Sequence, residues 1–394
     1  MLIEIHILQN HAPSNLNRDD TGSPKECVFG GVKRARISSQ CLKRSIRQSD
    51  IFQRELAGQL GMRTRRLPEL VRERLEKDGL PSDLAAVAAL KATGFGTKDG
   101  KERPNGDDNK DLDTAQTMFL TEADIEAVVA VLKKAAEEAG NVKKFKDVKA
   151  SDLQALAKTN GFRPISVDVA LFGRMITSEA FRDVEASMQV AHALSTHKVD
   201  HEFDYFTAVD DLQVKGEDDA GADMIGDFEF NSSCYYKYCS LDVHAFCRNL
   251  TGEGHGRRTV SDDDKAKSVE LAKKTIDAFL RGAIMSTPSG KQNSCAAHQL
   301  PSLILIEVRP YRTPVSYANA FVEPAYAGKG TGLVVASLEK IGAHIQALTD
   351  GFDLEASTRL LLAPEHREFA IHGVERMPSL NTLCARLQEV VVYG

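Results

Sequence analysis

The sequence contains no tryptophan, and aromatic residues make up only 6% of its 394 residues. Proteins that hold single-stranded nucleic acid by stacking its bases present exposed aromatic rings, so a broad stacking surface is not expected. No apolar stretch approaches the roughly 20 residues of a membrane-spanning helix. The first residues, MLIEIHILQNH, lack the basic start of a signal peptide. These absences predict a protein that has no contact with membranes.

The seven cysteines are odd in number and scattered along the chain. Cys234 and Cys239 have no second pair at zinc-ligand spacing, and alternation places them on opposite faces of a strand. Free thiols without a pairing pattern are typical of the reducing cytoplasm. The sequence therefore predicts a cytoplasmic protein without disulfide bonds or a zinc site.

Motifs for nucleotide chemistry and catalysis are also missing. Residues 96–101 do not have Walker A spacing, and no GxGxxG or HExxH pattern is present. Three histidines between residues 192 and 201 are interpreted as members of caps or polar networks. Asp19 and Asp20 are paired carboxylates that could hold a metal ion or act as acid and base. With no partner histidine or third carboxylate, an Asx-type turn is favoured there, and we predict no catalytic residue, no metal site and no cofactor.

Charge is segregated along the chain. The net charge is −6, yet residues 27–49 contain six Lys or Arg and no Asp or Glu, which leaves −12 for the rest. A local basic segment on an acidic protein is typical of a polyanion-binding site. The basic residues of this segment are Lys33, Arg34, Arg36, Lys43, Arg44 and Arg47.

Part of this segment has the pattern of a helix with one basic face. Ser38 is a good N-cap for a helix that begins near Ser39. Leu42 and Ile46 would lie on the opposite face and pack against a sheet. The outer face would hold Gln40, Lys43, Arg44 and Arg47. A charged run is usually only a solvated face, but no acid at i±4 neutralises this one, so nucleic-acid binding is the favoured interpretation.

The order of the remaining elements predicts an α+β fold with a split βαβ sheet. Residues 51 to about 160 are helical in period and are interpreted as an insertion. Helices are also predicted for 184–197, for 262–283 with Ser261 as N-cap, and for the C-terminal tail. An acidic hairpin is predicted for 198–226. Strands are predicted for 2–8, 167–175, 228–243 and 301–310.

Several segments resemble the CasC family, the crRNA-binding backbone subunit of the type I-E CRISPR Cascade complex, within the RAMP superfamily. They run in the family's order from residue 1 to about residue 322, whereas the helical insertion and the C-terminal tail match only loosely. The segments are HAPSNLNRDD, FGGVKRARISSQCLKRSIR, ALFGRMITS, AHALSTHKVDHEFDYFTAVDDL, KQNSCAAHQLPS and VSYANAF.

The resemblance implies a modified RRM or ferredoxin-like palm, a helical finger and a long hairpin thumb. The palm would comprise residues 1–50, 161–197 and 231–394, the last with a helical tail. The finger would be 51–160 and the thumb 198–230. Unlike the family, this thumb carries a longer acidic tip, GEDDAGADMIGD, at residues 216–227.

The resemblance also implies a non-catalytic role. Copies of the chain would stack head to tail along the crRNA, bind its phosphates, displace nucleotides at regular intervals and leave the guide open to pair with target DNA. The other partners would be the large subunit, the small subunit, the 5′-handle-binding subunit and the crRNA-processing endonuclease. The RNA-binding residues carried over are Arg18, Lys25, Ser38, Ser39, Gln40, Lys43, Arg44, Arg47, Arg174, Met175, His197 and Thr207.

Two alternatives remain open from the sequence. Related backbone subunits cleave target RNA with a loop aspartate, for which Asp19 or Asp20 would be the candidate here. A monomeric RRM-like RNA-binding protein is the other.

Overall fold

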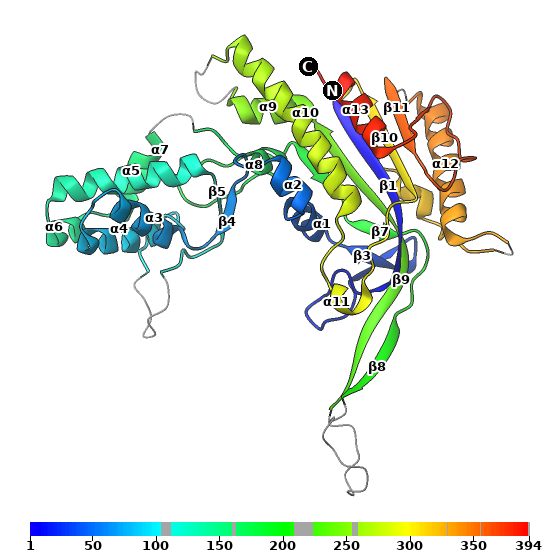
Figure 1. Ribbon diagram of the computed structural model, residues 1–394, viewed down its shortest axis with the longest axis horizontal. Helices are drawn as coiled ribbons and strands as arrows, with labels where there is room; N and C mark the ends of the chain where they lie inside the picture. Colours follow the sequence, from blue (N-terminus) through cyan, green and yellow to red (C-terminus); the bar gives the residue numbers. More distant parts are fainter. Residues whose placement is uncertain are drawn as a thin grey trace, which may run out of the picture.

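The centre of the computed structural model is a ten-stranded mixed sheet (Figure 1), so the α+β prediction is confirmed. The residues that the structure describes are 1–103, 112–159, 163–208, 224–253, 259–328, 330–354 and 356–392. Two short strands, β6 (Met188–Val190) and β8 (Glu202–Ala208), pair with β9 outside the main order. The main order is β12 (Glu375–Arg376), β11 (Thr358–Leu362), β10 (Leu303–Arg309), β1 (Leu2–Ser14), β9 (Met224–Asp242), β7 (Ala193–Ser195), β3 (Val32–Ile37) and β2 (Glu26–Phe29).

Strand β1 lies in the middle of this sheet and is covered on both faces. It pairs antiparallel with β10 on one side and β9 on the other. Successive side chains point to opposite faces, so Ile3, Ile5 and Ile7 join one hydrophobic cluster and Leu8 joins another. The first cluster is covered by α1 (Ser39–Arg47), α2 (Asp50–Glu55), α8 (Val167–Phe172), α9 (Val243–Thr251), α10 (Asp262–Met285) and α13 (Leu380–Val390).

The opposite face of the sheet packs against the 3-10 helix η1 (Tyr317–Phe321) and α12 (Leu333–Phe352). A short helix, α11 (Gln292–Cys295), contacts β1 near its end. Among the helices that the structure describes, none has the length and hydropathy needed to cross a membrane.

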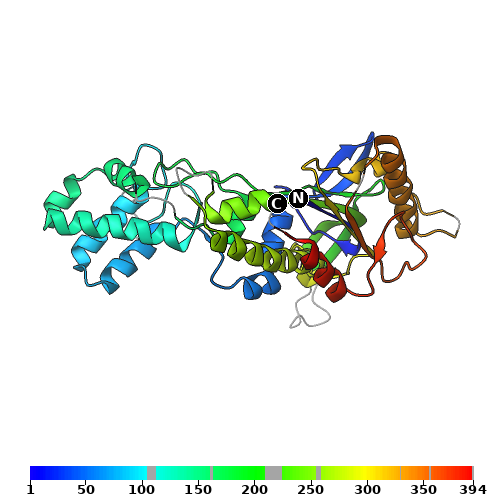
Figure 2. The same ribbon diagram turned by 90° about the horizontal axis from the view of Figure 1, so that it is seen from above.

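The helical insertion has a hydrophobic core of its own and lies at one end of the molecule (Figures 1 and 2). A two-stranded ribbon formed by β4 (Met62–Thr64) and β5 (Met118–Leu120) lies between this core and the sheet. The helices of the insertion are α3 (Leu67–Lys77), α4 (Ser82–Gly94), α5 (Glu122–Ala139), α6 (Val142–Asp147) and α7 (Ala150–Thr159).

A long hairpin projects away from the sheet (Figure 1). In it, β8 pairs antiparallel with the first part of β9, from Glu202 opposite Phe230 to Ala208 opposite Met224. Most of the acidic tip predicted at 216–227 lies outside the described residues.

The helix starts predicted for the first βα unit and for α10 are confirmed, as are the buried positions predicted for α1. Ser38 caps α1 by accepting a hydrogen bond from the Cys41 N–H, and Ser261 caps α10 in the same way. Leu42 and Ile46 are buried. The strands predicted for 2–8, 228–243 and 301–310 are present as β1, β9 and β10.

Three predicted elements are wrong. The predicted strand 167–175 is helix α8, whose residues 167–171 are all buried, so no alternating pattern marked it. The predicted helix 184–197 contains β6 and β7, in which buried and more exposed residues alternate. The C-terminal region is not wholly helical, because β11 joins the sheet between α12 and α13.

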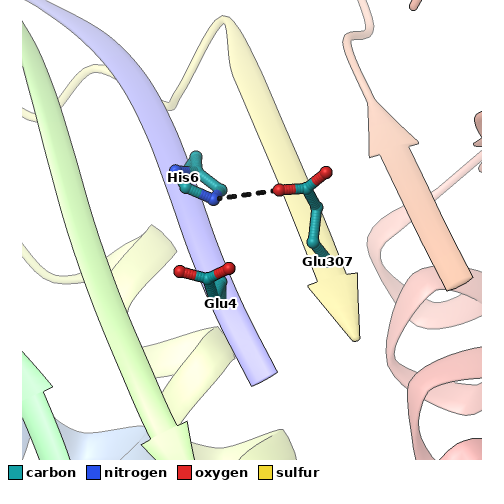
Figure 3. Close-up of side chains that lie close together, drawn as sticks. All are labelled: Glu4, His6 and Glu307. Carbon is teal, nitrogen blue, oxygen red and sulfur yellow. Dashed lines mark ion pairs between the residues drawn. The ribbon is translucent and has the colours of Figure 1, made fainter. Parts of the chain in front are cut away.

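Three buried residues, Glu4, His6 and Glu307, come together between β1 and β10 (Figure 3). Their ligand atoms lie within 4.8 Å of one another, a spacing that could suit a metal ion. Two arginines already neutralise the carboxylates: Arg309 donates to both Glu4 and Glu307, and Arg359 donates to Glu307 at 2.6 Å. The cluster is therefore interpreted as a buried ion network that joins neighbouring strands.

Replacing Glu307 with glutamine should lower the free energy of unfolding by about 3 kcal/mol at neutral pH, because two buried guanidinium groups lose an anionic partner. Burial alone would raise the pKa of Glu307, but the His6 ring and the Arg309 guanidinium lower that pKa to about 2. A lowered pKa stabilises the fold above the unfolded value, and this stabilisation is lost as the pH falls toward the folded value. Urea unfolding should therefore show the difference narrowing below about pH 4.5, and a difference that stays constant to about pH 3 would contradict this assignment.

Candidate nucleic-acid interface

The basic face of α1 opens onto a cavity of about 250 Å³, called here the basic pocket. Capping by Ser38 and burial of Leu42 and Ile46 fix the rotation of α1, so that the opposite face points into this cavity. The structure thus brings together six of the residues predicted from the sequence. The lining residues are Gln40, Lys43, Arg44, Arg47, Arg63, Thr117, Phe119, Phe172, Gly173, Arg174 and Met175.

Three cations that line the basic pocket remain accessible to an anionic ligand. Among the residues that the structure describes, Lys43, Arg44 and Arg63 have no ion-pair partner. The Lys43 ammonium lies 5.5 Å from the centre of the Phe172 ring, and burial lowers the pKa of this ammonium. Unpaired cations around a cavity attract an anion, and phosphate is the anion that a nucleic-acid backbone supplies.

Arg47 differs from these three because it has a buried acidic partner. Its Nε donates to Oδ2 of Asp168 at 2.9 Å, and its guanidinium lies 4.9 Å from the centre of the Phe119 ring. Oδ1 of Asp168 accepts a hydrogen bond from the Gly61 N–H at 2.8 Å. The sequence offered no acid within one helical turn of Arg47, but α8 supplies one. Arg47 therefore joins α1 to the start of the insertion, and its predicted contact with a guide phosphate stays a prediction for a side chain that already has an acidic partner.

The other half of the basic segment does not face the pocket. Lys33 pairs with Glu26 at 3.1 Å, and Arg36 contacts the His192 ring at 3.0 Å. Arg34 is fully buried and donates to the carbonyl oxygens of Phe29, Ser195, Phe321 and Val322. Arg34 therefore serves the interior of the fold, whereas RNA contacts by Lys33 and Arg36 stay predictions.

Arg174 and Met175 are adjacent in sequence and opposite in environment. Arg174 is buried, and its guanidinium donates to Asp124 at 2.5 Å and to the Phe119 carbonyl oxygen at 3.0 Å. It is therefore a supporting residue of the pocket wall in this structure, and its predicted contact with RNA stays a prediction. Met175 is 93% exposed, as expected for a side chain that a partner covers.

The remaining predicted residues lie outside the basic pocket or serve local structure. Ser38 is buried and its hydroxyl is used as the cap, while Ser39 and Lys25 are partly exposed. Thr207 is exposed on the projecting hairpin, and His197 is half-buried at its base, where burial lowers the pKa of the ring.

Arg18 is exposed and lines a separate cavity with Asp19 and Asp20. Oδ1 of Asp19 accepts hydrogen bonds from the backbone N–H groups of Thr21 and Ser23, which confirms the predicted Asx-type turn. The Thr21 hydroxyl and these N–H groups lower the pKa of Asp19.

Residues missed from the sequence include the lining residues Arg63, Thr117, Phe119 and Phe172, and Asp168, which holds Arg47. Arg63 and Phe119 lie opposite each other in the β4–β5 ribbon, inside a region interpreted as helical. Asp168 and Phe172 belong to a segment interpreted as a strand. The available signal was the segment VDVALF, where one acid interrupts an apolar run and requires a buried partner.

Comparisons with known proteins agree with this architecture. The family model of CT1975-like proteins (Cas_CT1975) matches residues 3–386. A chain of a "CRISPR RNA-guided surveillance complex, pre-nicking" is 28% identical with a TM-score of 0.80, and the match covers 100% of both chains. A chain of another "CRISPR RNA-guided surveillance complex" has the same fold, with 22% identity, a TM-score of 0.71 and 99% coverage of both chains. No curated protein sequence matches the chain.

Proposed function

The chain belongs to the CT1975-like family, and on this premise we propose that it is the non-catalytic backbone subunit of a type I-E CRISPR surveillance complex. Several copies assemble head to tail along the spacer of a crRNA and bind its phosphates. The guide bases remain available to pair with a target DNA strand. The observation that carries the proposal is the basic pocket, where Lys43 and Arg44 have no ion-pair partner among the residues that the structure describes and where Met175 is exposed.

The shape of the chain supports an assembly in which each copy contacts the next. The β8–β9 hairpin extends beyond the sheet (Figure 1) and carries Thr207 away from the basic pocket of its own chain. Exposed aromatic residues on this hairpin, Phe203 at 52% and Tyr205 at 74%, are expected to be covered in an assembly. We propose that the hairpin reaches the guide RNA beside a neighbouring copy and displaces a nucleotide there.

Binding of a single-stranded guide RNA by the purified chain tests the proposal. Affinity should fall steeply with salt, because each phosphate contact releases counterions. A duplex DNA of equal length should bind more weakly, since the proposed site reads one strand. Equal affinity for both, with no dependence on salt, would overturn the proposal.

The absence of catalysis is part of the proposal and has its own test. Asp19 is fixed in its turn by Thr21 and Ser23, and Asp20 is exposed. We expect no cleavage when the assembled complex is incubated with complementary RNA and Mg²⁺. Cuts at regular intervals that disappear in Asp20→Ala would identify a ribonuclease instead.

A further inference from the structure

The β4–β5 ribbon has two faces that belong to different parts of the molecule. On one face, Met118 and Leu120 are buried in the core of the insertion. On the other, Phe119 lies opposite Arg63 and packs against the cluster beneath the sheet. Because directly opposed residues share a face, Arg63 and Phe119 together form a wall of the basic pocket.

We infer that this wall is the second half of a binding site for one nucleotide of single-stranded RNA, and that RNA bound there holds the helical insertion against the sheet. The inference rests on the proposed function and extends it to Arg63 and the ribbon. It makes the basic pocket a clamp between two parts of the chain.

The charges favour a phosphate between the two walls. Arg63 is exposed and, among the described residues, has no ion-pair partner. Two acids that contact lining arginines of the pocket are already engaged, Asp168 by Arg47 and Asp124 by Arg174. Unneutralised cations thus stand on both sides of the cavity, and a guanidinium can bind a phosphate through two parallel hydrogen bonds.

The apolar lining and the size favour a nucleotide over a free anion. Phe119, Phe172 and Met175 line the same cavity as the cations, so the displaced nucleotide of the proposed function can lie against them while its phosphate contacts Arg63. The volume of about 250 Å³ lies just below the range of sites for drug-sized ligands. It therefore suits a single nucleotide unit.

Polar contacts near this site help to connect the insertion to the sheet. Asp168 holds both Arg47 and the Gly61 N–H, and Arg174 holds the Phe119 carbonyl oxygen. A ligand that contacts α1 and the ribbon together stabilises the arrangement to which it binds. RNA binding should therefore order the ribbon.

Arg63→Ala tests the inference, with Arg72→Ala as its matched control. Arg72 is an exposed arginine on α3 that pairs with Glu76, so its loss changes the charge of the insertion equally without touching the pocket. We expect Arg63→Ala to weaken binding of a single-stranded guide RNA by about tenfold, the loss of one charged hydrogen-bonding group. The slope of log affinity against log salt should fall by about 0.7, as for one phosphate of a single strand. Arg72→Ala should bind as the unchanged protein does.

Hydrogen exchange provides the second readout. RNA should slow exchange of the amides at 62–64 and 118–120 in the unchanged protein, and should do so much less in Arg63→Ala. If Arg63→Ala binds like Arg72→Ala and exchange in the ribbon does not respond, the clamp is wrong even though the chain binds RNA. If the unchanged protein does not bind the RNA, the proposed function itself fails, and the clamp with it.

Discussion

Replacing Lys43 and Arg44 together with glutamate is expected to weaken guide RNA binding by about a hundredfold, roughly tenfold for each charged contact removed. These side chains line the basic pocket and have no ion-pair partner among the described residues. Replacing them therefore breaks no ion pair, and we expect only a small change in the free energy of unfolding. Fluorescence anisotropy with a labelled single-stranded RNA measures the loss. Thermal unfolding should show that the variant remains folded.

The control for this double reversal is Arg72→Glu with Lys77→Glu, two exposed residues of α3. It makes the same change in net charge away from the pocket. If both variants lose the same affinity, the effect is one of overall charge and the pocket is not the site. Arg47 is left out of the test because reversing it would place a second carboxylate beside the buried Asp168.

Replacing Asp168 with alanine is expected to lower the free energy of unfolding by about 3 kcal/mol, as is typical when one partner of a buried ion pair is removed. Asp168 is fully buried, the Arg47 side chain is 15% exposed, and the Gly61 N–H would also lose its acceptor. Urea unfolding monitored by circular dichroism measures the change.

Asp78→Ala is the matched control, since Asp78 forms an exposed pair with Lys133. Exposed pairs contribute about 1 kcal/mol or less. An Asp168→Ala variant as stable as Asp78→Ala would mean that Asp168 does not join α1 to the insertion.

Local patterns in the sequence were sufficient for the first βα unit. The cap at Ser38 and the burial of Leu42 and Ile46 depend on residues within a few positions of one another, so the α1 basic face could be predicted. Segment 167–172 could not be assigned in this way, because a short apolar run fits a buried strand or a buried helix equally well. The three-residue strands β6 and β7 form by pairing with β9, which is distant in sequence, so local patterns could not predict them.

The candidate site was predicted only on its α1 side for the same reason. Arg47 and Asp168 are 121 positions apart, and Arg63 meets Phe119 only through the register of the ribbon. Charge counting along the chain cannot separate Lys43, which has no ion-pair partner in the described part of the chain, from the buried Arg34, since the tertiary fold decides which charges are paired. Met175 was predicted only from the family resemblance, because the residues around it in the sequence do not indicate that its side chain is exposed.

The mass of the assembly formed on guide RNAs of increasing length tests the central claim most directly. A backbone subunit that binds phosphates and contacts its neighbours should add whole copies of the 43.1 kDa chain as the RNA is lengthened. Multi-angle light scattering should show this stepwise growth for the unchanged protein and its loss for the Lys43→Glu, Arg44→Glu variant. A constant mass of one chain per RNA at every length would contradict the account.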